Sequence, residues 1–109
     1  MSMIRSNEIY CEGRMGCNPK IMVDRQTQSL SAEFSIYVTK SGEDTDKKIR
    51  HDVKVMEHSL ADWARINIRK GVRVGVAGEL DYEYYKASGK NLRKAFIRVN
   101  KPYGVSLLD

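Results

Sequence analysis

Apolar and polar residues alternate with a period of two along most of this chain, which is typical of β-strands that bury one face. The clearest run is residues 30–39, where apolar side chains from Leu30 to Val38 share one face and polar side chains share the other. Similar alternation recurs at four other places. The sequence therefore predicts five strands, over residues 8–12, 30–39, 49–56, 72–85 and 91–100.

Glycine and proline residues interrupt two of these strands. Gly13, Gly16 and Pro19 follow the first strand, and residues 21–23 have the pattern of a short continuation. Gly78 lies in the middle of the fourth strand. Glycine inside a strand is typical of a bulge or a sharp bend, which a small barrel needs in order to close. Both interruptions are therefore expected at corners of a closed sheet.

One short helix is predicted between the third and fourth strands. Ser59 is expected to cap its N-terminus, with Asp62 three residues later in the first turn. Apolar residues then recur at helical spacing, and Gly71 ends the helix after a basic last turn. Trp63, the single tryptophan of the chain, is expected to plug one end of a barrel rather than to stack on a nucleobase.

The order of these elements narrows the fold class. Three strands, a short helix and two more strands is the order of an OB-fold, an all-β barrel of five strands that is partly open. Alternation alone also permits other small barrels, and the helix between strands three and four is what favours the OB-fold. Residues 1–109 are long enough for one modest core. We expect a single OB-fold domain with a mobile hairpin loop at about residues 40–48.

The charge of the chain is unevenly distributed. Its net charge of +5 arises from 9 basic and 10 acidic residues before Arg65, and from 10 basic and 4 acidic residues from Arg65 onward. A basic half on a small domain favours a polyanionic partner, most commonly a nucleic acid. The alternative is a solvated surface that is basic without being a binding site.

Residues that could perform catalysis do not come together in the sequence. It contains no glycine-rich phosphate loop, no paired inward carboxylates, no nucleophile beside a base and no metal-ligand spacing. Cys11 and Cys17 are expected to be free thiols, and His51 a hydrogen-bonded structural histidine. We therefore expect no enzyme, metal, cofactor or small-molecule substrate. No apolar run approaches the ~20 residues that cross a bilayer, so no membrane partner is expected.

Several segments resemble one known family. Residues 7–19 resemble the opening strand of bacterial and mitochondrial single-stranded DNA-binding proteins, with a glycine, a second glycine three residues later and a proline three beyond that. Residues 68–74 resemble the segment of that family in which Arg-Lys-Gly precedes a strand, and residues 100–108 resemble its closing strand. The resemblance covers nearly the whole chain and implies an OB-fold that binds single-stranded nucleic acid.

The chain departs from this family at the aromatic residues on which bases stack. Arg50 and Met56 occupy positions where the family has a tryptophan and a phenylalanine, and only Tyr85 stands at a matching aromatic position. A bacterial primosome subunit and the OB-fold subunits of the trypanosomatid mitochondrial RNA-editing complex also lack that stacking set, and in overall texture the chain is more similar to the latter. This resemblance implies a mitochondrial protein that binds single-stranded RNA weakly and pairs with other OB-fold subunits.

Two functional hypotheses follow. In the first, the protein binds single-stranded RNA within an editing complex, or single-stranded DNA in replication, through salt-dependent contacts that tolerate any sequence. The residues expected to contact the nucleic-acid backbone are Arg50, Lys54, Arg73, Lys86, Lys90, Arg93, Lys94 and Arg98. Tyr85 is the first candidate to stack on a base. Tyr82 and Tyr84 are further candidates, with packing at the base of the hairpin as their alternative role.

In the second hypothesis, the domain is an assembly module that pairs with other OB-folds or with copies of itself and binds little nucleic acid. Tyr10, Tyr37, Met56 and Phe96 are expected to face outward. They favour this hypothesis because aromatic residues and methionine are enriched at protein interfaces. Both activities are compatible with one small barrel.

Overall fold

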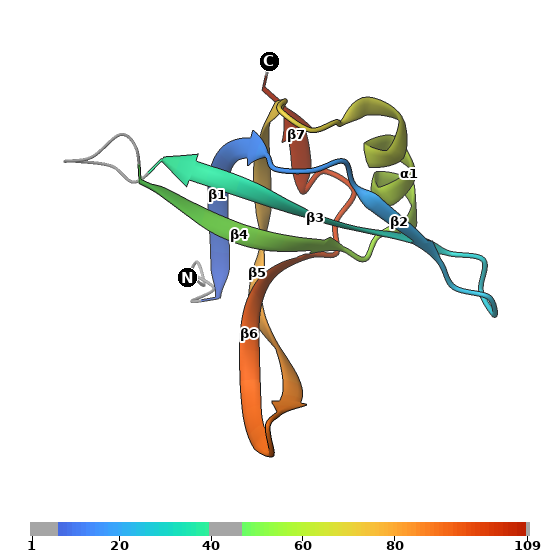
Figure 1. Ribbon diagram of the computed structural model, residues 1–109. Coiled ribbons are helices and arrows are strands. Elements are labelled where there is room, and N and C mark those ends of the chain that lie inside the picture. Colours follow the sequence, from blue (N-terminus) through green and yellow to red (C-terminus); the bar gives the residue numbers. More distant parts are fainter. Residues whose placement is uncertain (1–6, 40–46, 109) are drawn as a thin grey trace, which may run out of the picture.

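The computed structural model describes residues 7–39 and 47–108, which form a strongly curled sheet with a single helix beside one end (Figure 1). In chain order the elements are β1 (Glu8–Met15), β2 (Lys20–Val23), β3 (Leu30–Thr39), β4 (Lys48–Val55), α1 (His58–Asn67), β5 (Arg73–Ala87), β6 (Lys90–Val99) and β7 (Val105–Leu107). The expected mobile loop at about 40–48 falls mostly outside the described residues. Within the described residues, no helix has the length and apolar character needed to span a membrane.

Five strands close into a ring in the order β1-β3-β4-β6-β5, and β5 pairs back with β1. Neighbours in this ring are antiparallel except β4 and β6, which are parallel. The short strands β2 and β7 add to the outer edges of β3 and β5. In chain order the helix comes between the third and fourth strands of the ring. This is the OB-fold arrangement, and the predicted fold class is confirmed.

The interior of the barrel is filled by the apolar members of the alternating runs. Isoleucine and valine supply its largest fully buried side chains, in keeping with their preference for strands. The core consists of Met15, Ala32, Phe34, Ile36, Val53, Val55, Leu60, Ala61, Ala64, Ile68, Val74, Val76, Ile97, Val99 and Val105. Because successive side chains of a strand point to opposite faces, this core places the intervening polar residues on the outside of the barrel.

The outer ends of β3 and β4 extend beyond the core. Ile49 alternates in step with the buried Val53 and Val55, which predicts that it is buried too, but its side chain is among the exposed hydrophobic residues. The reason is that β6 pairs with β4 only from Val53 to Val55. Before Val53, β4 has β3 as its partner in the described sheet, so no third strand covers it.

Helix α1 begins two residues earlier than the sequence indicated. Glu57 is the N-cap, and its carboxylate accepts a hydrogen bond of 2.7 Å from the backbone N–H of Leu60. The prediction that Ser59 caps the helix is therefore wrong. Ser59 lies inside the helix and its hydroxyl donates to the Glu57 carboxylate at 2.7 Å. A longer carboxylate side chain has thus taken the capping role, and it also places a negative charge at the positive end of the helix dipole. Trp63 packs half-buried against the core, as expected.

The strand interruptions mark places where strands change partners. β1 does not stop before Gly13 but continues to Met15, pairing first with β5 and at its end with β3. β5 runs without a break through Gly78, which pairs with Ile9 of β1, and from Glu79 onward it pairs with β6. Near Gly13, β1 therefore passes from β5 to β3, and near Gly78, β5 passes from β1 to β6.

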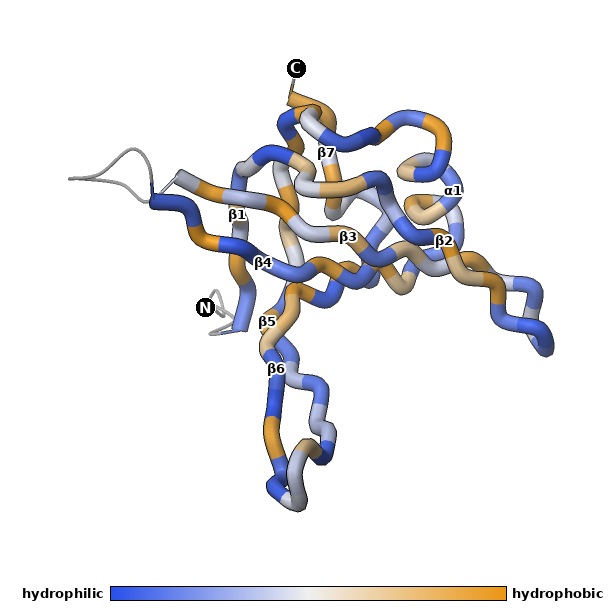
Figure 2. Tube along the Cα trace, viewed as in Figure 1, coloured by the Kyte–Doolittle hydropathy of each residue, from blue (hydrophilic) through white to orange (hydrophobic). Residues whose placement is uncertain are grey.

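A long hairpin of β5 and β6 projects from the barrel (Figure 1). Its two strands stay paired as far as Ala87 and Lys90. Ser88 and Gly89 form the turn with positive φ angles of 53° and 75°, a conformation typical of a two-residue hairpin turn. Figure 2 shows that hydrophilic residues predominate at the tip of this hairpin, whereas hydrophobic and hydrophilic segments alternate along β4.

Candidate nucleic-acid interface

A groove of about 360 Å³ lies on the outer face of β3, β4 and β6. Its floor comes mainly from these strands. The other lining residues are Cys17 between β1 and β2, Lys20 at the start of β2 and Glu83 on β5. The residues that line it are Cys17, Lys20, Glu33, Phe34, Ser35, Arg50, Asp52, Val53, Lys54, Glu83, Lys94 and Phe96. Four of these side chains are cationic and three are carboxylates, so the groove combines opposite charges rather than presenting a purely basic surface.

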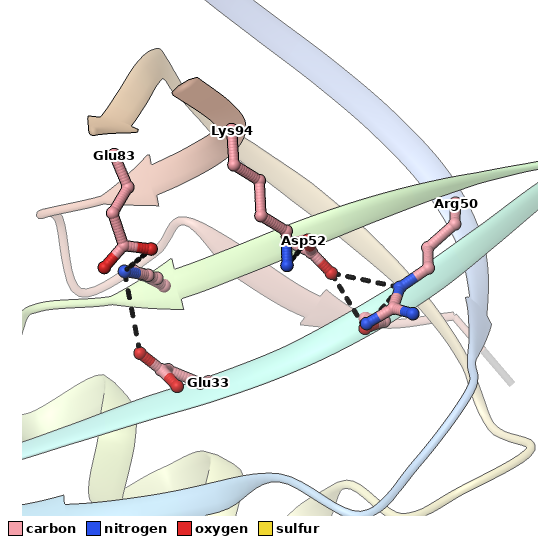
Figure 3. A network of polar contacts seen from close by, with 7 residues as sticks. Glu33, Arg50, Asp52, Glu83 and Lys94 are labelled. Carbon is pink, nitrogen blue, oxygen red and sulfur yellow. Dashed lines mark hydrogen bonds and ion pairs between the residues drawn. The ribbon is translucent and has the colours of Figure 1, made fainter. Parts of the chain in front are cut away.

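Asp52 lies at the centre of the first charge network, which joins three strands (Figure 3). Its carboxylate is 2.9 Å from the Lys94 ammonium on β6 and 3.1 Å from Nε of Arg50 on its own strand. The hydroxyl of Ser35 on β3 donates to the same carboxylate at 3.1 Å. Ser35 is itself buried. These contacts link the three strands through their side chains and hold two cations beside one carboxylate.

The environment of Asp52 favours its ionised form. Partial burial opposes ionisation, but the hydrogen bonds from Lys94 and Ser35 and the charges of Lys94 and Arg50 outweigh it. The pKa of Asp52 is therefore held below its ordinary value. At neutral pH the carboxylate is negative, and any phosphate that approaches Lys94 or Arg50 competes with it.

Lys54 forms the second charge network (Figure 3). Its ammonium is 3.1 Å from the Glu83 carboxylate on β5 and 3.7 Å from that of Glu33 on β3. It also lies over the ring of Phe96, 4.6 Å from the ring centroid. A cation–π contact of this kind stabilises by about 0.5–2 kcal/mol, and partly exposed ion pairs by about 0–1 kcal/mol each. Lys54 is thus held by several weak contacts at once.

Comparison with known proteins decides the family. The chain matches the family described as "Single-strand binding protein family" over residues 6–102. The chain belongs to the single-strand binding protein family. Among solved structures it is similar to that of "Plasmodium falciparum SSB complex with ssDNA", with a TM-score of 0.85 and 25% sequence identity over 100% of both chains. A search of curated proteins finds no match.

Membership in the single-strand binding protein family confirms the resemblance seen in the sequence. Proteins of this family bind their ligand without chemical conversion, in agreement with the sequence, which holds no catalytic arrangement. Within the described residues, no group of three or more metal-ligating side chains gathers in one place. An RNA-editing subunit is a narrower expectation, and neither match bears on it.

Three of the expected backbone-contacting residues line the groove of this family member, and a fourth extends it. Arg50, Lys54 and Lys94 lie in the groove itself. Along the hairpin, Glu83 pairs with Lys94, Tyr85 with Leu92 and Ala87 with Lys90. Because paired residues of an antiparallel hairpin share one face, Tyr85 and Lys90 continue the groove face toward the tip. Tyr85 is 47% exposed there.

Four other predicted residues lie on the opposite face of the hairpin. Tyr82 pairs with Ala95, Tyr84 with Arg93 and Lys86 with Asn91, so their side chains point away from the groove. The guanidinium of Arg93 lies over the Tyr82 ring, 4.6 Å from its centroid. Tyr84 is 73% exposed, and packing at the base of the hairpin is therefore excluded for it.

The last two predicted residues are held by carboxylates outside the groove lining. Arg73 at the start of β5 pairs with Glu12 of β1 at 2.9 Å. Arg98 on β6 pairs with Asp81 at 2.7 Å and Glu79 at 3.4 Å. Arg98 also lines a separate cavity of about 500 Å³ beside β1. This larger cavity gathers two lysine or arginine side chains against two glutamates, so its size does not make it the better candidate for a polyanion.

Sequence reasoning identified three of the four cations of the groove, Arg50, Lys54 and Lys94, and missed Lys20 and the carboxylates. Glu33 and Asp52 occupy outward positions of β3 and β4. The alternation that predicts an outward side chain for Arg50 also predicts one for each of them. Glu83 and Phe96 come from the hairpin, and Lys20 is the first residue of β2. No local pattern places these residues beside β4, because that depends on how β4 and β6 pair.

Replacing Asp52 with asparagine is expected to make the stability of the domain less dependent on pH. A carboxyl with a lowered folded pKa stabilises the fold above its unfolded pKa of about 3.9, and this stabilisation is lost as the pH falls through the folded pKa. At pH 7 the variant should be less stable by about 1–2 kcal/mol, since Arg50 and Lys94 are more than half exposed and their contacts are screened.

The test of the Asp52 prediction is urea unfolding of both proteins at pH 7 and at about pH 2.5, where the difference should shrink toward zero. An equal difference at the two pH values would show that packing, and not the charge of Asp52, determines the effect. Asp62→Asn on helix α1 is the control because it removes an exposed carboxylate that pairs with Arg65 outside the groove.

Proposed function

We propose that this protein binds single-stranded DNA along the groove and the adjoining hairpin face. The observation that carries the proposal is the gathering of Lys20, Arg50 and Lys94 in one groove across the OB-fold strands, continued by Tyr85 and Lys90. Support also comes from the full-length similarity to an SSB whose structure contains single-stranded DNA. In chemical terms, the cations would contact phosphates and Tyr85 would stack on a base.

Binding of this kind is expected to tolerate any sequence and to be moderate in strength. Phosphate contacts carry no sequence information, and every base offers a π-face to an aromatic ring. The affinity is limited because Asp52 and Glu83 already neutralise Lys94, Arg50 and Lys54. Each cation must exchange a carboxylate for a phosphate, so only the difference between the two contacts contributes to binding.

We propose DNA as the ligand of this protein, and RNA is the alternative. Discrimination would require a residue placed to recognise the 2′-hydroxyl, and the groove offers no obvious candidate among the residues that line it. The DNA-bound relative favours DNA. The more specific expectation of an RNA-binding subunit of a mitochondrial editing complex stays a prediction.

Self-association is proposed alongside DNA binding. Tyr10 of β1 is 57% exposed and Tyr103 of the loop before β7 is 72% exposed, and both line the cavity beside β1. Exposed aromatic residues of this kind are enriched at protein interfaces. This surface lies apart from the groove lining, so pairing with a second copy or with another OB-fold would leave the groove accessible.

The experiment that tests the proposal is a salt titration of binding to fluorescent oligo-dT and oligo-U, with light scattering of the free protein. Micromolar or tighter binding to oligo-dT at low salt is expected. Four phosphate contacts, by Lys20, Arg50, Lys90 and Lys94, would give a slope of log K against log salt of about −2 to −3. Tighter binding to oligo-U would favour RNA, and the lack of binding to either at low salt would overturn the proposal.

A further inference from the structure

Phe96 is a partly exposed aromatic residue in the lining of the groove. It lies on β6, paired with Asp81 of β5, and its side chain shares the outer face with Lys94 and Arg98. The ring lines the groove and is only partly buried. In the free protein, the face of this ring is covered by the ammonium of Lys54.

The residues that hold Lys54 over this ring come, with Lys54 itself, from three strands. The Lys54 ammonium stands 4.6 Å from the ring centroid, and carboxylates of Glu83 and Glu33 hold it from the two sides at 3.1 Å and 3.7 Å. The Lys54 side chain is 23% exposed, whereas that of Glu83 is 54% exposed. The contact with Glu83 can therefore open toward solvent without exposing any part of the core.

We propose that Phe96 is a base-stacking site which Lys54 occupies in the free protein. A nucleobase of the bound strand displaces the ammonium from the ring, and Lys54 moves from Glu83 to a neighbouring phosphate. The inference rests on the proposed DNA binding and adds to it a second stacking position, distinct from Tyr85. Its ligand is an unpaired nucleobase with a phosphate on at least one side.

The geometry suits this exchange. The flexible four-carbon stem of a lysine can swing its ammonium off the ring while the backbone of β4 stays fixed. Arg50 and Lys94 lie in the same groove as Phe96, so a phosphate next to a stacked base has cations within the groove. Aromatic rings hold bases of any kind, which agrees with sequence-tolerant binding.

The first test compares Phe96→Leu with the unchanged protein in the oligo-dT salt titration. The variant is expected to bind five- to tenfold more weakly at every salt concentration with an unchanged salt slope, because stacking involves no counterion. Tyr82→Leu is the matched control: it removes a ring on the opposite face of the same hairpin, outside the groove, which a cation, Arg93, also approaches at 4.6 Å. It should bind like the unchanged protein.

The Lys54→Met variant tests the role of the Lys54 ammonium separately from that of the Phe96 ring. This variant uncovers Phe96 and removes one phosphate contact, so its salt slope should become less steep by about 0.7. Its affinity should equal or exceed that of the unchanged protein at high salt, where the phosphate contact contributes least. A Lys54→Met variant that loses affinity at all salt concentrations by the same factor would contradict the exchange.

The Phe96→Trp variant reports stacking directly through its fluorescence. This test stays valid even if the Phe96→Leu variant does not fold. Its added fluorescence, measured against the Trp63 background of the unchanged protein, is expected to fall on saturation with oligo-dT. Unchanged emission at saturation would overturn the proposal, as would unaltered affinity of a correctly folded Phe96→Leu variant. If the unchanged protein fails to bind oligo-dT, that result contradicts the proposed function itself. If it binds but the Phe96 variants show no effect, only the stacking proposal is contradicted.

Discussion

Gly78→Ala is expected to lower the free energy of unfolding by about 2–3 kcal/mol, near the upper end of what overpacking costs. A β-carbon at this position would lie 2.5 Å from the backbone oxygen of Arg98 and 2.8 Å from Cγ2 of Ile97. Neither neighbour can swing away, because one is backbone and the other belongs to the buried core. Strands β5 and β6 would have to separate where β5 leaves β1.

Gly75→Ala is the matched control for Gly78, since it makes the same change on the same strand. A β-carbon there would approach the hydroxyl of Tyr10 at 2.5 Å, and this hydroxyl is the far end of an exposed side chain that can turn away. We expect a loss of less than about 1 kcal/mol. Both losses can be measured by urea unfolding followed by circular dichroism.

For a domain of this size, the Gly78 variant should unfold about 10–15 °C below the unchanged protein. Equal losses at the two glycines would show that strand propensity, and not the close approach of β5 to β6, determines the effect. A Gly78 variant as stable as the unchanged protein would contradict the tight crossing of the two strands.

The fold could be predicted from the sequence because the signals that define it are local. Alternation at residues 30–39 and 72–76 identifies strands without reference to any other part of the chain, and the position of the helix then selects the OB-fold. The helix cap was missed for a physical reason. Ser59 matches the usual pattern of a cap, but Glu57, two positions earlier, has a carboxylate long enough to cap the helix by accepting from the backbone N–H of Leu60.

The candidate site was predicted only in part because it depends on which strands become neighbours. Arg50, Arg73 and Arg98 are chemically alike in the sequence. Pairing of β5 with β1 carries Arg73 to Glu12, and the β5–β6 register carries Arg98 to Glu79 and Asp81. Only Arg50 remains in the groove. The contact of Asp52 with Lys94 likewise depends on the parallel pairing of β4 and β6, which no local pattern determines.

The double variant Arg50→Gln with Lys94→Gln is expected to bind oligo-dT about 25-fold more weakly at 0.1 M salt. Each phosphate contact with a single strand contributes about 0.7 to the slope of log K against log salt, so loss of two contacts removes about 1.4 log units between 1 M and 0.1 M. The slope itself should become less steep by about 1.4. Asp52 would then lack both cations and would repel the strand further.

The matched control for this variant removes two positive charges elsewhere, as Arg65→Gln with Lys101→Gln. Arg65 lies on helix α1 and Lys101 in the loop before β7, and neither lines the groove. Both double variants have the same net charge, so long-range attraction of the strand is reduced equally in each. The control should bind within about twofold of the unchanged protein, since surface charges outside the groove contribute little beyond a Debye length of about 10 Å.

Comparison of the two double variants separates local contact from overall charge. If both lose affinity equally, net charge alone attracts the strand and the groove is not its path. If only the groove variant loses affinity while its urea midpoint stays close to that of Asp52→Asn, the loss comes from missing phosphate contacts rather than from unfolding. The carboxylates then limit affinity in the intact groove because Arg50, Lys54 and Lys94 must leave Asp52, Glu83 or Glu33 before they can contact DNA.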